Sequence, residues 1–130
     1  GWYRDESGSR EPVPDPEVEE LIRAKAAEPG IARREIGADE IIERTLYPLI
    51  NEGAKILEEG IAARASDIDV VWVNGYGFPI GKGGPMFWAG LEGAGKIVER
   101  LEYWQEQTGK DVFKPAPLLR RMAGTGSWEA

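Results

Sequence analysis

The chain has 130 residues and a mass of 14.3 kDa, which is the size of one domain with a core of its own. It contains no cysteine and no histidine, so disulfides, thiol nucleophiles, Cys- or His-ligated metal ions and imidazole bases are excluded. The net charge of −7 comes without a basic patch, and no apolar run reaches the ~20 residues of a membrane span, so neither nucleic acid nor a membrane span is expected. The default location is the cytoplasm.

The first predicted elements are an extended lead-in and a helix. Residues 1–14 are polar and carry two prolines, which favours an extended segment. A helix is predicted over residues 16–27, because Asp15 can cap it and Pro16 suits its first position. Pro29-Gly30 ends this helix.

The strongest helical pattern covers residues 38–62. Pro48 lies inside it and is expected to kink the helix or split it in two, and Gly60 can end its last turn. Beside Asn51, in the middle of the pattern, Glu52 would need a partner such as Arg44 if it were buried. The apolar positions that repeat at helical spacing are Ile42, Leu46, Leu49, Ile50, Gly53, Leu57 and Ile61.

Local signals disagree over residues 66–73. Ser66 followed by Asp67 and Asp69 resembles a helix cap with acids in the first turn, whereas the run Val70-Val71-Trp72-Val73 on its own favours a strand. A Gly-rich loop follows over residues 74–85. The remaining expected elements are a short helix after Pro85, a helix from residue 93 or 94 to 108, a short helix over 116–123, and a loose tail over 124–130. Within that tail, Trp128 could dock on the rest of the domain.

The Gly-rich loop suggests a dinucleotide or phosphate site at first sight, but its details argue against one. Residues 75–81 have the spacing GxGxxxG with Pro79 in the turn, and no helix opens at the third glycine. Gly83 stands where a phosphate-binding loop needs Ser or Thr. We therefore predict a structural turn in which several glycines adopt a positive φ.

The other candidate groups have ordinary structural explanations. Carboxylate pairs could serve acid–base chemistry, but Asp67 and Asp69 are predicted to cap a helix, and the pairs Glu40/Glu43 and Glu58/Glu59 to lie on solvated faces. The tryptophans are predicted to be buried in a core or an interface in preference to stacking on a planar ligand. They are Trp2, Trp72, Trp88, Trp104 and Trp128.

Three blocks, at residues 43–54, 57–62 and 66–86, together resemble the C-terminal domain of the L-3-hydroxyacyl-CoA dehydrogenase family. The blocks read ERTLYPLINEGA, LEEGIA, and SDID continuing through GYGFP to GGPM, and the resemblance covers about residues 37–107. The opening Gly1-Trp2-Tyr3 is similar to the junction after the first of two tandem C-terminal domains in multifunctional fatty-acid oxidation enzymes. The chain is thus identified as the second, terminal copy, cut from such a protein.

The resemblance implies an all-helical domain, like the 6-phosphogluconate-dehydrogenase-like C-terminal domain of these enzymes, over residues 15–123. The run at residues 70–73 would then be helical despite its local preference. The family oxidises 3-hydroxyacyl-CoA to 3-ketoacyl-CoA with NAD, and its dinucleotide site and catalytic His–Glu pair belong to a preceding Rossmann domain. Reactive copies carry Asn where this chain has Glu43, so the resemblance implies a supporting domain without catalytic, cofactor-binding or metal residues, inactive alone.

The resemblance also implies partners. This copy would pack on the Rossmann domain and the first C-terminal copy and help to close the acyl-CoA cleft, and the isolated chain would form a homodimer. Two rival functions are an independent helical interaction module and a self-sufficient nucleotide-binding enzyme, and the reading frame upstream of Gly1 separates the module from the dehydrogenase domain. The residues expected to have structural or interface roles are Asn51, Glu52, Gly60, Asp67, Asp69, Gly75, Gly77, Phe78, Pro79, Gly83, Gly84, Pro85 and Trp88.

Overall fold

A computed structural model describes residues 3–4, 8, 11–29 and 34–128. Its contacts divide the chain into two units, Gly1–Glu35 and Ile36–Ala130, which we describe separately. None of the helices in the described ranges is both long enough and apolar enough to cross a membrane.

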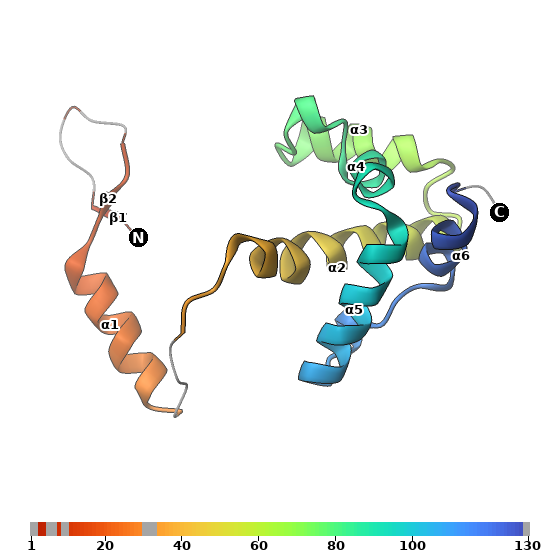
Figure 1. The fold of residues 1–130 in the computed structure, drawn as a ribbon. Helices are drawn as coiled ribbons and strands as arrows, with labels where there is room; N and C mark the ends of the chain where they lie inside the picture. The colour runs from red at the N-terminus through yellow and green to blue at the C-terminus, as the bar shows by residue number, and fades with distance from the viewer. Residues whose placement is uncertain (1–2, 5–7, 9–10, 30–33, 129–130) are drawn as a thin grey trace. The chain divides into compact units, whose positions relative to one another are not determined.

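The first unit contains a small hairpin and one helix (Figure 1). Strand β1 (Tyr3–Arg4) pairs antiparallel with β2 (Val13–Pro14), and helix α1 (Pro16–Ala27) follows. The Asp15 carboxylate accepts a hydrogen bond of 3.0 Å from the Glu17 N–H, so the predicted cap and helix are confirmed. No residue of α1 is buried within this unit.

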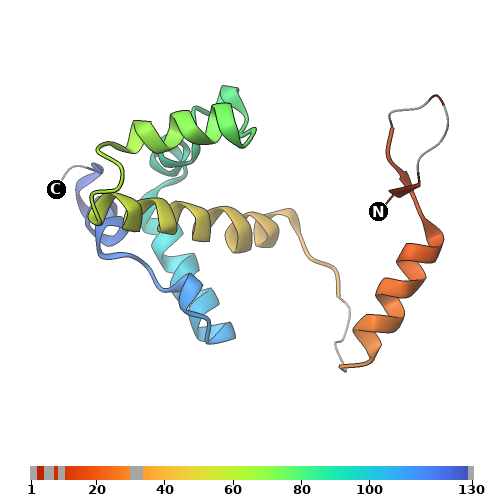
Figure 2. The same ribbon diagram turned by 180° about the vertical axis from the view of Figure 1, so that it is seen from behind.

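The second unit is a bundle of helices, and the all-helical fold class is confirmed. The longest helix, α2, passes through its middle, with α3 and α4 beside each other on one side of it and α5 and α6 packed together and against α2 (Figures 1 and 2). The elements are α2 (Ala38–Glu58), α3 (Ala65–Gly75), the 3₁₀ turn η1 (Ile80–Lys82), α4 (Pro85–Glu92), α5 (Ala94–Thr108), the 3₁₀ turn η2 (Asp111–Phe113) and α6 (Pro117–Thr125).

Helix α2 follows the sequence-based prediction in part. Of the two effects expected of Pro48, a kink or a split, the split does not occur, because the helix continues through Pro48 as one element. It ends at Glu58 and not near residue 62, because Gly60 adopts φ +69° and its N–H bonds the Leu57 carbonyl, which closes the last turn. Ile61, expected on the apolar face, is therefore exposed.

The disputed run at residues 70–73 is helical, as the resemblance implied. It lies within α3, whose inner side buries Ile68 and Asp69 against the neighbouring helices. Four residues of high strand propensity thus adopt the helix because burial of that side outweighs a local preference of under ~1 kcal/mol per residue.

The core of the second unit lies between α2, α5 and α6. Asn51 is the buried polar residue at its centre: its side-chain amide donates to the Lys114 carbonyl at 2.8 Å and accepts from the Ala116 N–H at 2.7 Å. Trp128 packs against this core and donates to the Met86 carbonyl at 3.2 Å, which confirms that it docks. The largest fully buried apolar side chains are Tyr47, Ile50, Met86, Ile97, Leu101 and Leu119.

Candidate functional site

Asp69 of α3 fixes the end of the Gly-rich loop that leads to α4. The Asp69 carboxylate accepts hydrogen bonds from the N–H groups of Met86, at 2.7 Å, and Phe87, at 3.1 Å, at the start of α4. The prediction that Asp69 caps its own helix is therefore wrong, because the side chain points inward to the next helix. Burial raises the pKa of Asp69, and the two N–H donors offset this only in part. Asp67, by contrast, does close the start of α3, accepting from the Arg64 N–H at 3.0 Å.

The loop glycines have the backbone geometry that was predicted. Gly77, Gly83 and Gly84 have φ of +72°, +78° and +105°. The first N–H groups that α4 could offer to a phosphate are already bonded to Asp69. The described part of the loop thus provides a fixed turn and no fit for the pyrophosphate of a dinucleotide.

An apolar hollow of about 410 Å³ opens between α2, the end of α3 and this loop. We call it the α2–α3 hollow. The only charged residue among the described residues that line it is Lys82. The lining residues are Ile42, Leu46, Leu49, Trp72, Tyr76, Gly77, Phe78, Pro79, Lys82 and Trp88. A second hollow, of about 480 Å³, shares Trp72 and Tyr76, whose rings lie 4.9 Å apart.

Helices α3 and α4 carry apolar side chains on the sides that this unit does not cover. Val70 of α3 is 60% exposed and Leu91 of α4 is 70% exposed, and Val71 and Phe87 are more than half exposed. Large apolar side chains that are exposed together on neighbouring helices mark a surface that another protein segment normally covers. The two helices and the two hollows together therefore form a candidate interaction surface.

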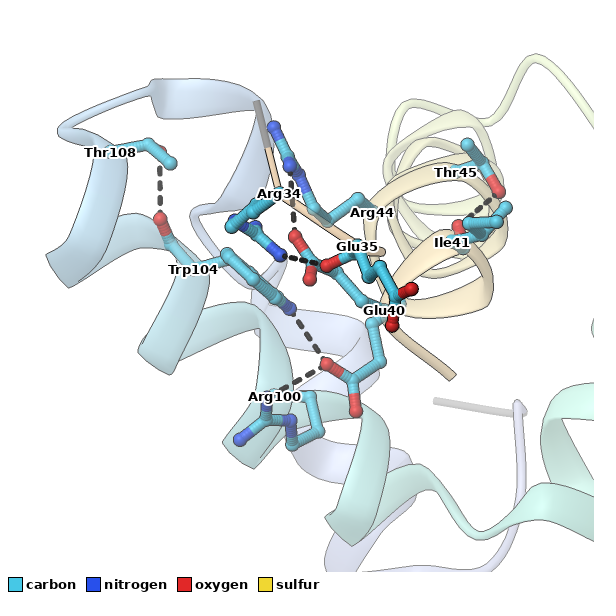
Figure 3. Close-up of polar contacts among 10 residues, drawn as sticks. Arg34, Glu35, Glu40, Ile41, Arg44, Thr45, Arg100, Trp104 and Thr108 are labelled. Carbon is cyan, nitrogen blue, oxygen red and sulfur yellow. Dashed lines mark hydrogen bonds and ion pairs between the residues drawn. The ribbon is translucent and has the colours of Figure 1, made fainter. Parts of the chain in front are cut away.

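A polar cluster joins α2 to α5 at the position where the resemblance marks a departure from reactive copies. One oxygen of the Glu43 carboxylate accepts from the Arg100 guanidinium and from the Trp104 indole N–H, both at 2.8 Å (Figure 3). Burial raises the pKa of Glu43, but these two donors and the charge of Arg100 outweigh it, so the pKa is lowered overall. The Arg44 guanidinium lies 5.1 Å from the centre of the Trp104 ring. Glu43 thus fastens two helices together.

We expect Glu43→Gln to remove pH-dependent stability. A carboxylate with a lowered pKa in the folded state stabilises the fold above its unfolded pKa of about 4.5, and the effect is lost as the pH falls through the lowered value. Urea unfolding should therefore show a loss of roughly 1–3 kcal/mol at pH 7 and a smaller loss at pH 3. The matched control is Glu52→Gln in the same helix, because Glu52 is exposed and its ion pair with Lys55 contributes little to stability. Equal losses at both pH values for Glu43→Gln would contradict the ion-pair assignment.

A second cluster joins α2 to α4 and α5, and no local sequence pattern predicts it. The buried Tyr47 hydroxyl donates to the Glu92 carboxylate at 3.0 Å, and Lys96 pairs with the same carboxylate. Burial, together with Glu92, raises the pKa of Tyr47 to about 12. At neutral pH this phenol holds its proton and so cannot act as a base.

The remaining predicted residues occupy varied positions. Glu52 is exposed and pairs with Lys55, while Arg44, its expected partner, pairs with Glu40 at 3.0 Å. Gly75 is the last residue of α3, and Pro85 is the buried first residue of α4. Phe78, Pro79 and Trp88 line the α2–α3 hollow. Trp104 is buried, as predicted, and Trp72, Trp88 and Trp128 are half-buried, whereas Trp2 lies outside the described residues.

No group of three or more acidic residues in the described ranges is arranged to hold a metal ion.

The sequence of the chain is similar to that of a known protein family. The family model described as "3-hydroxyacyl-CoA dehydrogenase, C-terminal domain" matches residues 41–129, which cover α2 except for its first three residues and all of α3 to α6. The chain belongs to this family.

Relatives in this family are much longer than the chain. A peroxisomal bifunctional enzyme of Danio rerio is 43% identical over 130 residues, which cover 98% of the chain and 18% of the relative. The Homo sapiens protein of that name is 40% identical over 129 residues, again 98% of the chain and 18% of the relative. A glyoxysomal fatty acid beta-oxidation multifunctional protein, MFP-a of Brassica napus, is 36% identical over 122 residues, 91% of the chain and 17% of the relative. The chain thus spans less than a fifth of these relatives, and the expected family membership is confirmed.

Proposed function

We propose that this chain is the supporting C-terminal domain of an NAD-dependent L-3-hydroxyacyl-CoA dehydrogenase of fatty-acid beta-oxidation, here called the parent protein. The parent oxidises 3-hydroxyacyl-CoA to 3-ketoacyl-CoA and reduces NAD to NADH. The observation that carries the proposal is the uncovered apolar side of α3 and α4, with its two hollows, in a chain that matches this family. That surface packs on the Rossmann domain and the first C-terminal copy beside the acyl-CoA cleft.

The chemistry of the residues supports a role without catalysis. The chain has no histidine, Glu43 is bonded to Arg100 and Trp104, and Tyr47 keeps its proton at neutral pH. The start of α4 is bonded to Asp69, so NAD has no fit in the loop of this chain. Both the base and the dinucleotide site therefore belong to the rest of the parent protein.

The proposed location is the peroxisome, in place of the default cytoplasm. The three relatives carry the words peroxisomal or glyoxysomal in their names, and the animal and plant proteins are alike in this respect. Immunofluorescence of the parent protein beside a peroxisomal marker tests the location.

Sequencing the gene upstream of the first codon of the chain tests the function. A Rossmann domain with a Gly-rich fingerprint, followed by a first C-terminal copy, is the expected result. An unrelated upstream domain would favour the independent interaction module and overturn the proposal.

Without its parent, the isolated chain should associate with itself, because an apolar surface that is normally covered is left in water. Multi-angle light scattering at micromolar concentration should give twice the mass of one chain. Val71→Asp, on the exposed side of α3, should shift the chain to monomers, whereas Glu106→Arg, at an exposed position of α5, should not. A strict monomer of the unchanged chain at high micromolar concentration would contradict the expectation.

A further inference from the structure

The walls of the α2–α3 hollow have the form of a groove for a helix. Ile42, Leu46 and Leu49 lie four and three residues apart on one side of α2, which makes a stripe of about two helical turns, or ~10 Å. Trp72 and Phe78 belong to the other lining elements. An apolar channel beside a helix is the setting in which an amphipathic helix inserts side chains at helical spacing.

The apolar surface continues beyond the hollow, which indicates an occupant larger than a small molecule. Tyr76 is 71% exposed, and Ile80, in the turn between Pro79 and Lys82, is 82% exposed. A ligand of the size of the hollow would leave these side chains in water, whereas a helix would cover both the hollow and its edge.

The positive charge of Lys82 indicates that the occupant of the hollow carries a negative charge nearby. Lys82 is the one charged residue among the described residues that line the hollow, and none of the described residues forms an ion pair with its ammonium group. Covering this ammonium group with an apolar surface would cost the free energy of its hydration, unless the occupant brings a carboxylate to the same place. The local charge therefore selects an acidic partner.

We propose that the α2–α3 hollow receives an amphipathic helix from another part of the parent protein, with an Asp or Glu placed opposite Lys82. This inference rests on the proposed function, since it names the kind of segment that covers part of the interaction surface. In this arrangement the hollow binds the apolar side of the helix, and the ion pair with Lys82 fixes the orientation of the helix.

Carbodiimide cross-linking of the full-length parent protein, followed by mass spectrometry, tests the pairing. The reagent joins a lysine amine to a carboxylate in contact with it. The expected product links Lys82 to one acidic residue outside this chain, in a segment with apolar residues at helical spacing. Lys110, which is exposed and does not line the hollow, should give no such link.

Variants of the parent protein test the charge. Lys82→Glu should lower the melting temperature by roughly 3 °C or more, because like charges across an interface are strongly unfavourable. Lys82→Arg keeps the charge and should leave the melting temperature unchanged while abolishing the cross-link. Lys110→Glu is the matched control for an exposed lysine and should have no effect.

The outcomes separate the inference from the proposed function. Cross-links from other lysines of the chain to the rest of the parent, with none from Lys82 and no effect of Lys82→Glu, would overturn the inference alone. No cross-link from any lysine of the chain to the rest of the parent would count against both. Dodecanoate that binds the isolated chain with one site, and loses that site in Lys82→Glu, would assign the hollow to a small anionic amphiphile and overturn the helix.

Discussion

The isolated chain is expected to give no measurable oxidation of a 3-hydroxyacyl-CoA and no micromolar binding of NAD. Oxidation needs a base for the hydroxyl proton, and the chain has neither histidine nor an unengaged group of suitable pKa in its two polar clusters. It also needs a bound nicotinamide, but the amides at the start of α4 are bonded to Asp69.

The size of this effect makes the experiment decisive. General-base catalysis contributes roughly 10²–10⁴ in rate, and the positioning of two reactants contributes several further powers of ten. Losing both should leave nothing above the uncatalysed background. NADH absorbance with purified chain, NAD and substrate, together with calorimetric titration of NAD, gives the readout, and the full-length parent protein is the positive control. Clear turnover by the chain alone would show that the site lies within it.

Local signals in the sequence predicted most of the helices. The cap at Asp15 and the prolines at positions 16 and 85 mark helix starts that the structure confirms, and α5 ends at Thr108 as expected, with Gly109 at φ +66° closing its last turn. These signals act within one turn of the chain, so they can be recognised without knowledge of the fold. Helix α3 could be predicted only with the help of the family resemblance, because its helical state depends on burial against other helices.

The polar contacts of the site could not be predicted in the same way. Glu43 meets Arg100 and Trp104, which are 57 and 61 residues further along the chain, and Tyr47 meets Glu92 at a separation of 45. No local pattern encodes such pairs, since they depend on how the helices pack. The same holds for Asp69, which was predicted to cap its own helix and instead holds α4.

Gly84→Ala is expected to destabilise the domain more than the same change at any other loop glycine. A Cβ at this position would overlap the Asp69 side chain, and the backbone φ of +105° is strained for any residue other than glycine. The strain costs roughly 1–3 kcal/mol, and displacing the Asp69 carboxylate leaves a buried charge and two N–H groups without their bonds, at about 1–3 kcal/mol more. Urea unfolding should therefore show a loss of about 2–6 kcal/mol.

Gly77→Ala is the matched control, because it has φ +72° but open space around a new Cβ, so that only the left-handed backbone cost of about 1–2 kcal/mol applies. Gly83→Ala lies between the two, since its Cβ would meet the ring of Phe87, which is exposed and can turn away. In the double variant Asp69→Ala/Gly84→Ala the overlap is relieved, and its loss should be smaller than the sum of the two single losses. If the losses of unfolding free energy in the two single variants simply add in the double variant, a Cβ at position 84 does not clash with the Asp69 carboxylate. The cost of Gly84→Ala would then come from the backbone conformation of residue 84 alone.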